Sequence, residues 1–468
     1  MLRLLCIMIS VFVMLTPLTQ AEEIKNGEGG LTEDMIRRLR DAFPLEGKDR
    51  VLYNALSEND IKALTLNRDL YNATDKYFSH KIEIEGITDQ QKTGRCWLFA
   101  GYNILRPVVR EKLNLENFEF SQIYGQFWDK LEKANLFLES IIRTASLDLK
   151  DRKVEFLLKR PFPDGGQWHM VVDLNNKYGV VPKEVMPETK SSANTGTMNK
   201  LITRRLRLGA LVLRNMVSEG KSPEALETEK LNILKDVYRM LVLHLGEPPV
   251  EFTWRYEDKD EMLSEAKTYT PLQFYREVVE KDLSDYYCLY NCPAHPYNAL
   301  YQVELDRNLF DREDLTFINV TIEDLKTLTL AQLLDGEGVW FGCDVGKELY
   351  SDKGFLSTGM YAYEALYQVN LSMGKKERIL LHESIPTHAM VIIGVDMDGN
   401  RPAKWLIENS WGEERGDKGK YTMADAWFDE YVYAVIVDKT YIPERLLKIL
   451  DTEPVVLPPW DPMYALIQ

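Results

Sequence analysis

Cysteine, histidine and positive charge are all scarce in this 468-residue chain. Five cysteines and six histidines are too few for a fold built on a disulfide framework, because such folds are dense in cysteine. Lys and Arg number 57 against 73 Asp and Glu, and the net charge of −16 disfavours nucleic acid as a general partner. Low-complexity segments and internal repeats are absent. The composition therefore indicates a large globular protein stabilised by its hydrophobic core.

The one long apolar run lies at the N-terminus. Arg3 precedes a mainly apolar stretch from Leu4 to Leu15, and Thr19-Gln20-Ala21 offers small residues for cleavage. This run is too short to cross a bilayer comfortably, so residues 1–21 are predicted to be a secretory signal peptide and not a membrane anchor. We therefore expect an exported protein, periplasmic or secreted, with no stable membrane anchor.

The most informative segment is Gln90 to Ala100, where Cys96 opens an apolar run with helical periodicity that is predicted to continue to Lys112. A thiol at a helix N-terminus faces the positive end of the helix dipole, which lowers its pKa and favours the thiolate. Gln90 carries an amide that can donate a hydrogen bond to an oxyanion forming beside the sulfur. Taken alone, the same pattern also fits a buried structural cysteine ahead of a core helix.

Two later segments favour a catalytic cysteine. His388 stands at the start of a predicted apolar strand, although a single histidine in that position is more often structural. Asn409 ends another predicted strand and can accept a hydrogen bond from the His388 ring, with the Trp411 indole shielding that bond from water. Cysteine, histidine and asparagine in this order are typical of papain-like thiol proteases.

The spacing differs from that of ordinary papain-type chains. The separation of Cys96 and His388 is about twice the ~130–150 residues of those chains, so roughly 150 additional residues lie between the two halves of the site. A strongly helical, charge-rich stretch from Asn199 to about Leu245, together with the residues that follow it, accounts for the addition. Thr93-Gly94-Arg95 precede the cysteine, so the upstream cysteine of papain-type enzymes is missing.

With these motifs the chain resembles the bleomycin hydrolase and bacterial aminopeptidase C family of papain-like cysteine peptidases. The resemblance covers nearly all of the chain after the predicted signal peptide. The matching segments are Gln90–Ala100, Asp164–Trp168, Lys177–Lys183, Leu245–Pro249, Val339–Gly346, Glu383–Met390, Asn409–Gly412, Trp427–Tyr433 and Pro459–Met463.

The resemblance implies an α+β, papain-like fold with two lobes. A helical lobe carries the nucleophile, a β-barrel-like lobe carries the histidine and asparagine, and a large helical insertion separates them. The expected divisions are a signal peptide at 1–21, an N-terminal arm at 22–75, the helical lobe at 76–198, a mainly helical insertion at 199–335, the β-rich lobe at 336–450 and a C-terminal arm entering the cleft at 451–468.

The resemblance also implies the activity, that of an exported thiol aminopeptidase acting on peptides through a Cys96 thioester. Cys96, His388, Asn409 and Gln90 are the expected catalytic residues. The residues expected to bind substrate are Gly165, Gly166, Trp411 and the C-terminal Gln468. The two glycines would pair with the substrate main chain, although by themselves they also fit a tight turn without a ligand. Similar proteins are hexameric rings, so a homohexamer is expected.

No metal or cofactor is expected. Cys288 and Cys292 have a spacing that suggests a zinc site or a disulfide, but His295 is the only further ligand nearby and a second ligand pair is missing. A structural or incidental role is therefore the favoured interpretation. Two alternative functions stay open from sequence: an endopeptidase of the same fold, if the C-terminal arm does not occupy the cleft, and a catalytically silent binding or scaffold protein.

Overall fold

A computed structural model describes residues 29–464. The predicted signal peptide at 1–21 and Gln468 lie outside the described residues. The chain divides into two compact units, with the boundary after Leu64. Of the helices between residues 29 and 464, none has the length and hydropathy that crossing a bilayer requires.

The first unit is helical and exposed. It contains α1 (Glu33–Ala42) and α2 (Gly47–Glu58), and α3 (Ile61–Thr65) runs across the boundary. The Thr32 hydroxyl accepts a hydrogen bond from the backbone N–H of Met35 and so caps the N-terminus of α1. No residue of α1 or α2 is buried, so these helices leave their apolar side chains in contact with solvent.

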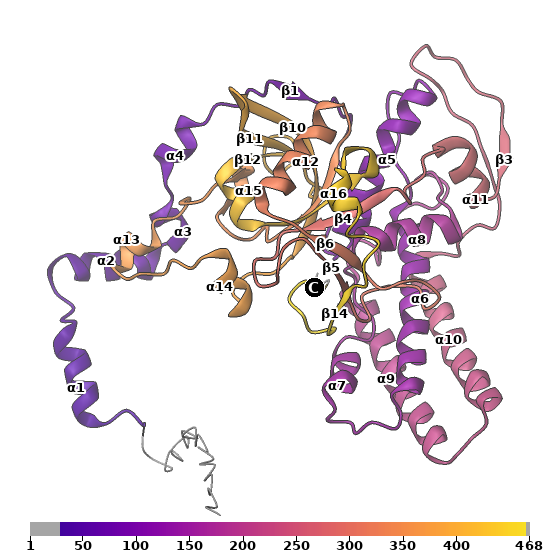
Figure 1. The fold of residues 1–468 in the computed structure, drawn as a ribbon, viewed down its shortest axis with the longest axis horizontal. Coiled ribbons are helices and arrows are strands. Elements are labelled where there is room, and N and C mark those ends of the chain that lie inside the picture. Colours follow the sequence, from indigo (N-terminus) through magenta and orange to yellow (C-terminus); the bar gives the residue numbers. More distant parts are fainter. Residues whose placement is uncertain (1–28, 465–468) are drawn as a thin grey trace, which may run out of the picture. The chain divides into compact units, whose positions relative to one another are not determined.

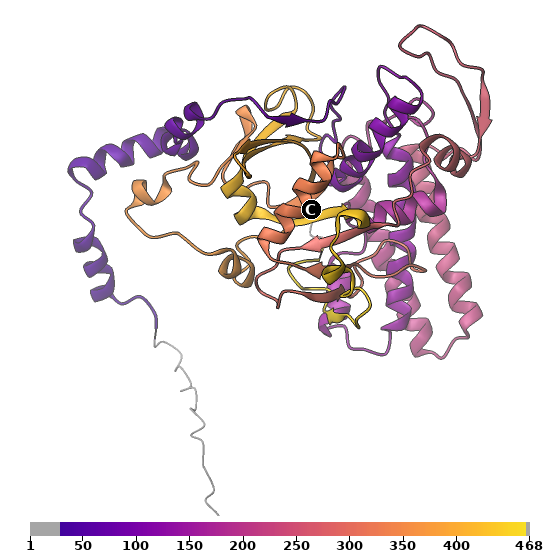
Figure 2. The same cartoon turned by 45° about the horizontal axis from the view of Figure 1, so that its top comes forward.

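The second unit is organised around one large sheet, which is clear in Figures 1 and 2. Its strands pair in the order β14-β5-β6-β4-β13-β7-β10-β11-β12-β9-β8, with β1 added on β10. The strands are β1 (His80–Lys81), β4 (Tyr286–Tyr290), β5 (Ala299–Val303), β6 (Thr316–Asn319), β7 (Val339–Cys343), β8 (Leu349–Tyr350), β9 (Phe355–Leu356), β10 (His388–Asp398), β11 (Arg401–Glu408), β12 (Lys420–Ala424), β13 (Val432–Asp438) and β14 (Val455–Leu457).

β10 and β11 form an antiparallel hairpin. Gly399 adopts a positive φ of 59°, a conformation that favours glycine and closes the two strands tightly. β10 also pairs with β7, which places His388 opposite Cys343. Residues 388–395 are all buried because sheet neighbours and helices cover them on both faces, as their continuous apolar sequence predicts.

Helices cover this sheet and extend from it as a bundle, in which α6, α9 and α10 lie side by side (Figure 1). The longer helices of the unit are α5 (Cys96–Lys112), α6 (Gln122–Arg143), α7 (Arg152–Lys159), α8 (Trp168–Tyr178), α9 (Gly196–Ser218), α10 (Pro223–Leu245), α12 (Ile322–Leu334) and α15 (Asp425–Tyr431). The shorter ones are α4 (Arg68–Ala73), α11 (Pro271–Phe274), α13 (Tyr363–Tyr367), α14 (Lys375–Leu380) and α16 (Glu444–Leu447).

α5 begins at Cys96 and ends at Lys112, as predicted. Phe99, Ile104, Leu105 and Val109 are buried, whereas Val108 is half-buried. One face of the helix therefore packs into the core.

The segment 199–335 differs from the expected mainly helical insertion. α9 and α10 form a close helical pair, in which a Cβ at Gly209 would lie 2.8 Å from the Ile233 side chain. After α10 the chain forms a separate hairpin from β2 (Phe252–Trp254) and β3 (Lys267–Tyr269). β4, β5 and β6 then join the large sheet, so much of this segment belongs to the same body as the β-rich lobe.

Candidate active site

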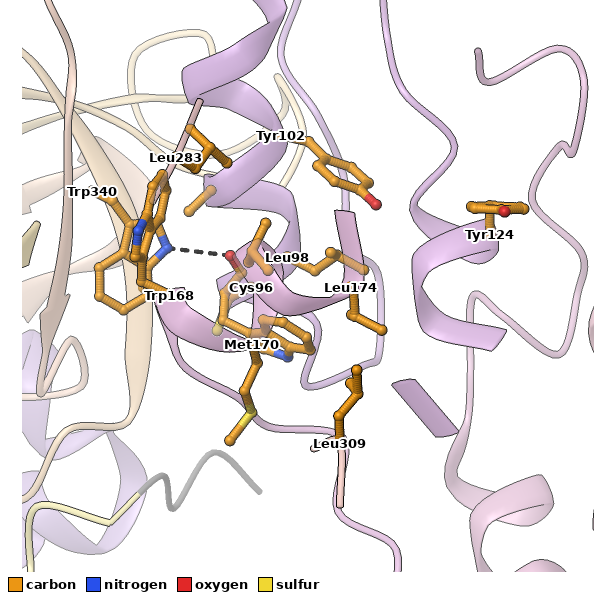
Figure 3. Close-up of a cluster of buried hydrophobic side chains, with 14 of the residues drawn as sticks. Cys96, Leu98, Tyr102, Tyr124, Trp168, Met170, Leu174, Leu283, Leu309 and Trp340 are labelled. Carbon is orange, nitrogen blue, oxygen red and sulfur yellow. Dashed lines mark hydrogen bonds between the residues drawn. The ribbon is translucent and has the colours of Figure 1, made fainter. Parts of the chain in front are cut away.

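Cys96 is the first residue of α5 and is fully buried. Backbone N–H groups of Cys96 itself, Trp97 and Ala389 donate hydrogen bonds to its sulfur. Figure 3 shows the side chain at the helix N-terminus among apolar neighbours that include Leu98, Trp168 and Met170. The free N–H groups of a helix start thus converge on the thiol, as expected from sequence.

His388 and Asn409 are brought together by the β10–β11 hairpin. The Nε2 atom of His388 lies 2.9 Å from Oδ1 of Asn409, and both side chains are buried. Because an amide oxygen only accepts, Nε2 carries the proton and Nδ1 is left as the basic nitrogen. The Trp411 ring covers this pair, with its centroid 4.8 Å from that of the imidazole. The geometry is the one inferred for Asn409 and Trp411.

The nucleophile and the imidazole meet at the start of β10. The residue that donates its N–H to the Cys96 sulfur, Ala389, directly follows His388. The start of α5 with Cys96 therefore lies against the start of the β10–β11 hairpin that holds His388 and Asn409. This arrangement can support proton transfer from a thiol to an imidazole oriented by an amide.

Burial shifts the pKa of Cys96 in the direction opposite to the one inferred from the helix dipole, and it shifts the pKa of His388 as well. It raises the pKa of the Cys96 thiol to about 12, although the three backbone N–H groups act to lower it. Burial likewise lowers the pKa of His388 to about 4, against the hydrogen bond to Asn409. An isolated charge is thus disfavoured on either group, because little water can solvate it.

Proton transfer from Cys96 to His388 is a different case. It creates two opposite charges side by side, so their mutual attraction offsets part of the loss of hydration. The thiolate expected from the position of Cys96 at a helix N-terminus is therefore corrected: the closed site favours the neutral thiol and imidazole. A neutral His388 is the form that can accept the Cys96 proton when substrate is attacked.

Gln90 is held beside the pair by Ser410. Its Oε1 accepts a hydrogen bond of 2.8 Å from the Ser410 hydroxyl, and its backbone N–H donates to the Ser410 carbonyl at 2.9 Å. Its Nε2 donates to the Thr93 carbonyl at 2.6 Å, which uses one of the two amide protons. The second N–H of a fixed, buried amide fits the expected role at the oxyanion.

The glycine loop, residues 162–166, precedes α8 and is fixed by side chains of α5 and α6. Four consecutive carbonyl oxygens, those of residues 162–165, accept hydrogen bonds from side-chain donors. Lys130 bonds the first two, Trp97 the third and Lys133 the fourth, the last at 2.6 Å. In this loop, which has no regular secondary structure, side-chain donors take the place of a backbone hydrogen-bond ladder.

Gly166 itself packs on the indole of Trp97, the residue after the nucleophile. A Cβ at this position would lie 2.6 Å from the ring, so only glycine fits. The close approach explains the second glycine of the pair and places the loop beside Cys96. Gly165 lines a small cavity together with Met170 and Tyr464, the last described residue of the chain.

Comparison with known proteins agrees with this geometry. The sequence profile of the peptidase C1-like family matches residues 30–464. The chain belongs to the peptidase C1-like family. Aminopeptidase C of Listeria innocua serovar 6a is 41% identical over 424 residues, which are 90% of this chain and 96% of that protein. Bleomycin hydrolase of Homo sapiens is 39% identical over 452 residues, 94% of this chain and 99% of that protein.

A solved structure shows the same fold. The crystal structure of PepW from Lactobacillus rhamnosis HN001 superposes with a TM-score of 0.91 at 38% identity, over 93% of this chain and 99% of that chain. The predicted family and the α+β, papain-like fold class are thus confirmed for this peptidase C1-like protein.

Sequence reasoning missed the charged side chains that support the peptidase C1-like site. Lys130 pairs with Asp164 at 2.6 Å and Lys133 with Asp129 at 2.8 Å, and all four are almost fully buried. An Asp four residues before a Lys on one helix was visible in the sequence as an i,i+4 pair. Such pairs are usually exposed, so the pattern does not reveal that this one is buried under the glycine loop.

Arg95 is a second missed support, and it occupies the region where papain-type chains carry their upstream cysteine. Its guanidinium makes two parallel hydrogen bonds to Glu188, at 2.9 and 3.0 Å, and a third to the Ser192 carbonyl. This buried fork fixes the turn before Cys96 by charge. Cys288, Cys292 and Cys343, like Cys96, are free and buried.

Proposed function

We propose that this protein is a thiol aminopeptidase that removes N-terminal residues from peptides through a thioester on Cys96. The observation that carries the proposal is the contact of the Cys96 sulfur with the backbone N–H of Ala389, the residue after His388, whose ring is oriented by Asn409 at 2.9 Å. The similarity to proteins named aminopeptidase C and bleomycin hydrolase supports peptides as the substrate class.

The chemistry follows from the positions of these groups. His388 accepts the Cys96 proton at Nδ1 as the sulfur attacks the peptide carbonyl, forming the carbon–sulfur bond. The Cys96 backbone N–H and the Gln90 amide stabilise the oxyanion. As the tetrahedral intermediate collapses, His388 returns the proton to the leaving amine. Water then adds to the thioester with His388 again as base, and the acid product leaves.

The C-terminal arm supplies selectivity for free amino termini. The last described residue, Tyr464, lies in the same small cavity as Gly165, so the arm approaches the glycine loop. We assign the carboxylate of Gln468 to the free amino group of the substrate. When the arm occupies the cleft on the side of the substrate amino group, it excludes any peptide that has further residues before the one to be removed.

Two further features belong to the proposal. The apolar stretch at residues 4–15 and the small residues before position 22 support export, to the periplasm or beyond the cell. The exposed apolar side chains of α1, which are Met35, Ile36 and Leu39, support assembly with further copies of the chain, with a homohexamer as the proposed state.

Substitution of the nucleophile tests the function. Cys96→Ala should abolish hydrolysis of aminoacyl arylamides and short peptides, because no other group there can form the thioester. Cys288→Ala, at a buried cysteine in β4, is the matched control and should keep its activity.

A second experiment separates the alternative functions. Wild-type enzyme should leave N-acetylated peptides uncut; equal cleavage of blocked and free peptides would instead establish an endopeptidase. Absence of hydrolysis in wild type, with Cys96 unreactive towards a peptide epoxide, would establish a silent scaffold.

A further inference from the structure

The C-terminal arm follows a defined path between the sheet and the glycine loop. β14 pairs in parallel with β5, and the Glu304 N–H extends this pairing by donating to the Leu457 carbonyl at 3.0 Å. The guanidinium carbon of Arg152 lies 4.2 Å from the centre of the Trp460 ring. Met463 is fully buried. These contacts fix the arm up to the point where it turns towards the glycine loop.

Asp461 makes that turn. Its backbone N–H donates to the Pro458 carbonyl at 2.9 Å, and its own carbonyl accepts the Tyr464 N–H at 3.0 Å. The carboxylate has two partners: Oδ1 accepts the Met463 N–H and Oδ2 lies against Nε2 of His295, each at 2.9 Å. One buried side chain thus sets both the bend of the arm and its attachment to the rest of the protein.

The His295 end of this contact is rigid. The side chain of Asn319, fully buried at the end of β6, donates to the carbonyl oxygens of Cys292, His295 and Pro296, each at 3.0 Å. Its Oδ1 accepts the Cys292 N–H at 2.8 Å. The segment with the Cys-x-x-x-Cys spacing, which resembles a metal site in sequence, therefore serves as a fixed support for the imidazole.

We propose that His295 and Asp461 are positioning residues that determine the selectivity of the enzyme for free amino termini. The proposal rests on the aminopeptidase function above and adds the residues that hold the arm in register. The bend at Asp461 directs Tyr464 into the cavity beside Gly165, and Tyr464 packs edge-on against Phe156 with ring centroids 5.2 Å apart. Loss of the His295–Asp461 bond frees the arm to leave the cleft while the catalytic groups stay in place.

The test compares cleavage of one peptide with a free and with an acetylated N-terminus. Asp461→Ala and His295→Leu should each raise the rate on the acetylated peptide by roughly 10- to 100-fold, the shift expected for losing a hydrogen bond to a charged group. The KM for the free peptide should rise while kcat is retained, because Cys96, His388 and Asn409 are untouched. His295→Gln keeps an N–H donor and should restore most of the wild-type selectivity.

Asp451→Asn is the matched control, since Asp451 is an exposed carboxylate in the same C-terminal segment and should change nothing. Because each single substitution breaks the same bond, the double variant Asp461→Ala/His295→Leu should resemble either single one.

If the wild type is selective for free amino termini, and Asp461→Ala and His295→Leu keep that selectivity, this proposal alone is overturned. A wild type that cuts acetylated and free peptides equally would overturn the proposed aminopeptidase function itself. Thermal melting of each variant checks that the chain is folded, and His295→Leu, which breaks the same bond, carries the test should Asp461→Ala not fold.

Discussion

The two sides of the active site are held by different forces. His388 and Asn409 are attached to a strand pair, in which β10 and β11 share a backbone ladder and an apolar core. The glycine loop has no ladder, and its carbonyl oxygens depend on two lysines and one indole. Support of the first kind is distributed over many weak contacts, whereas support of the second kind is concentrated in a few buried charges.

The difference predicts how each side responds to substitution. Loss of one methyl group in a strand leaves every other contact of the sheet in place. Loss of one buried ammonium removes the cation that is paired with a carboxylate in a region that water does not reach. The glycine loop should therefore be the more sensitive side, both in stability and in activity.

The largest effect is expected at Lys133. Lys133→Met removes the ammonium that bonds Asp129 and the Gly165 carbonyl, and Asp129 is only 1% exposed. We expect a loss of roughly 3–5 kcal/mol in the free energy of unfolding, because a buried charge is left unpaired. Denaturant unfolding of the variant and the wild type measures this difference in free energy. Lys159→Met breaks an exposed pair with Glu155 in α7 and should change stability by less than about 1 kcal/mol. Similar losses in both variants would remove the proposed contrast.

A smaller effect should accompany protonation of His388. Because its pKa is lowered to about 4, the unfolded chain binds more protons at this residue than the folded one as the pH falls below about 6.5. The stability contributed by neutral His388 is thus complete above about pH 6.5 and is lost towards pH 4. The loss amounts to about 3 kcal/mol. His388→Gln should lack this contribution, so its unfolding free energy should decline less steeply than that of wild type over the same range. Parallel declines would contradict the lowered pKa.

The smallest effect is expected within the strand pair. Ile407 is fully buried in β11, and Ile407→Val removes one methylene from a well-supported core. We expect a loss of about 0.5–1.5 kcal/mol in unfolding free energy and an unchanged kcat. A fall in kcat comparable to that of Lys133→Met would show that the strand side is as sensitive as the glycine loop.

Local signals in the sequence were enough to predict several elements. The start of α5 at Cys96, the β10–β11 turn at Gly399 and the partnership of His388 with Asn409 all follow from short motifs with a direct physical meaning. The burial of these groups is a tertiary property, so the sequence suggested the wrong direction for the Cys96 pKa. For the same reason the sequence did not show that Lys130 and Lys133 lie beneath the glycine loop.

Non-local pairing explains the remaining differences. β4, β5 and β6 are short strands in a segment whose beginning is strongly helical, and their partners include β13 and β14, more than a hundred residues further along the chain. Register and partner choice at that separation leave little trace in local periodicity. The family resemblance predicted the fold class, but it did not predict that these strands enlarge the main sheet.

The complete burial of Cys96 has a consequence for the chemical durability of the enzyme. Peroxides and other oxidants attack cysteine in proportion to its thiolate character and its accessibility, and the closed site keeps both low. The sulfur becomes nucleophilic only as a peptide is engaged. A reactive thiol kept in this dormant form is protected from oxidation between turnovers.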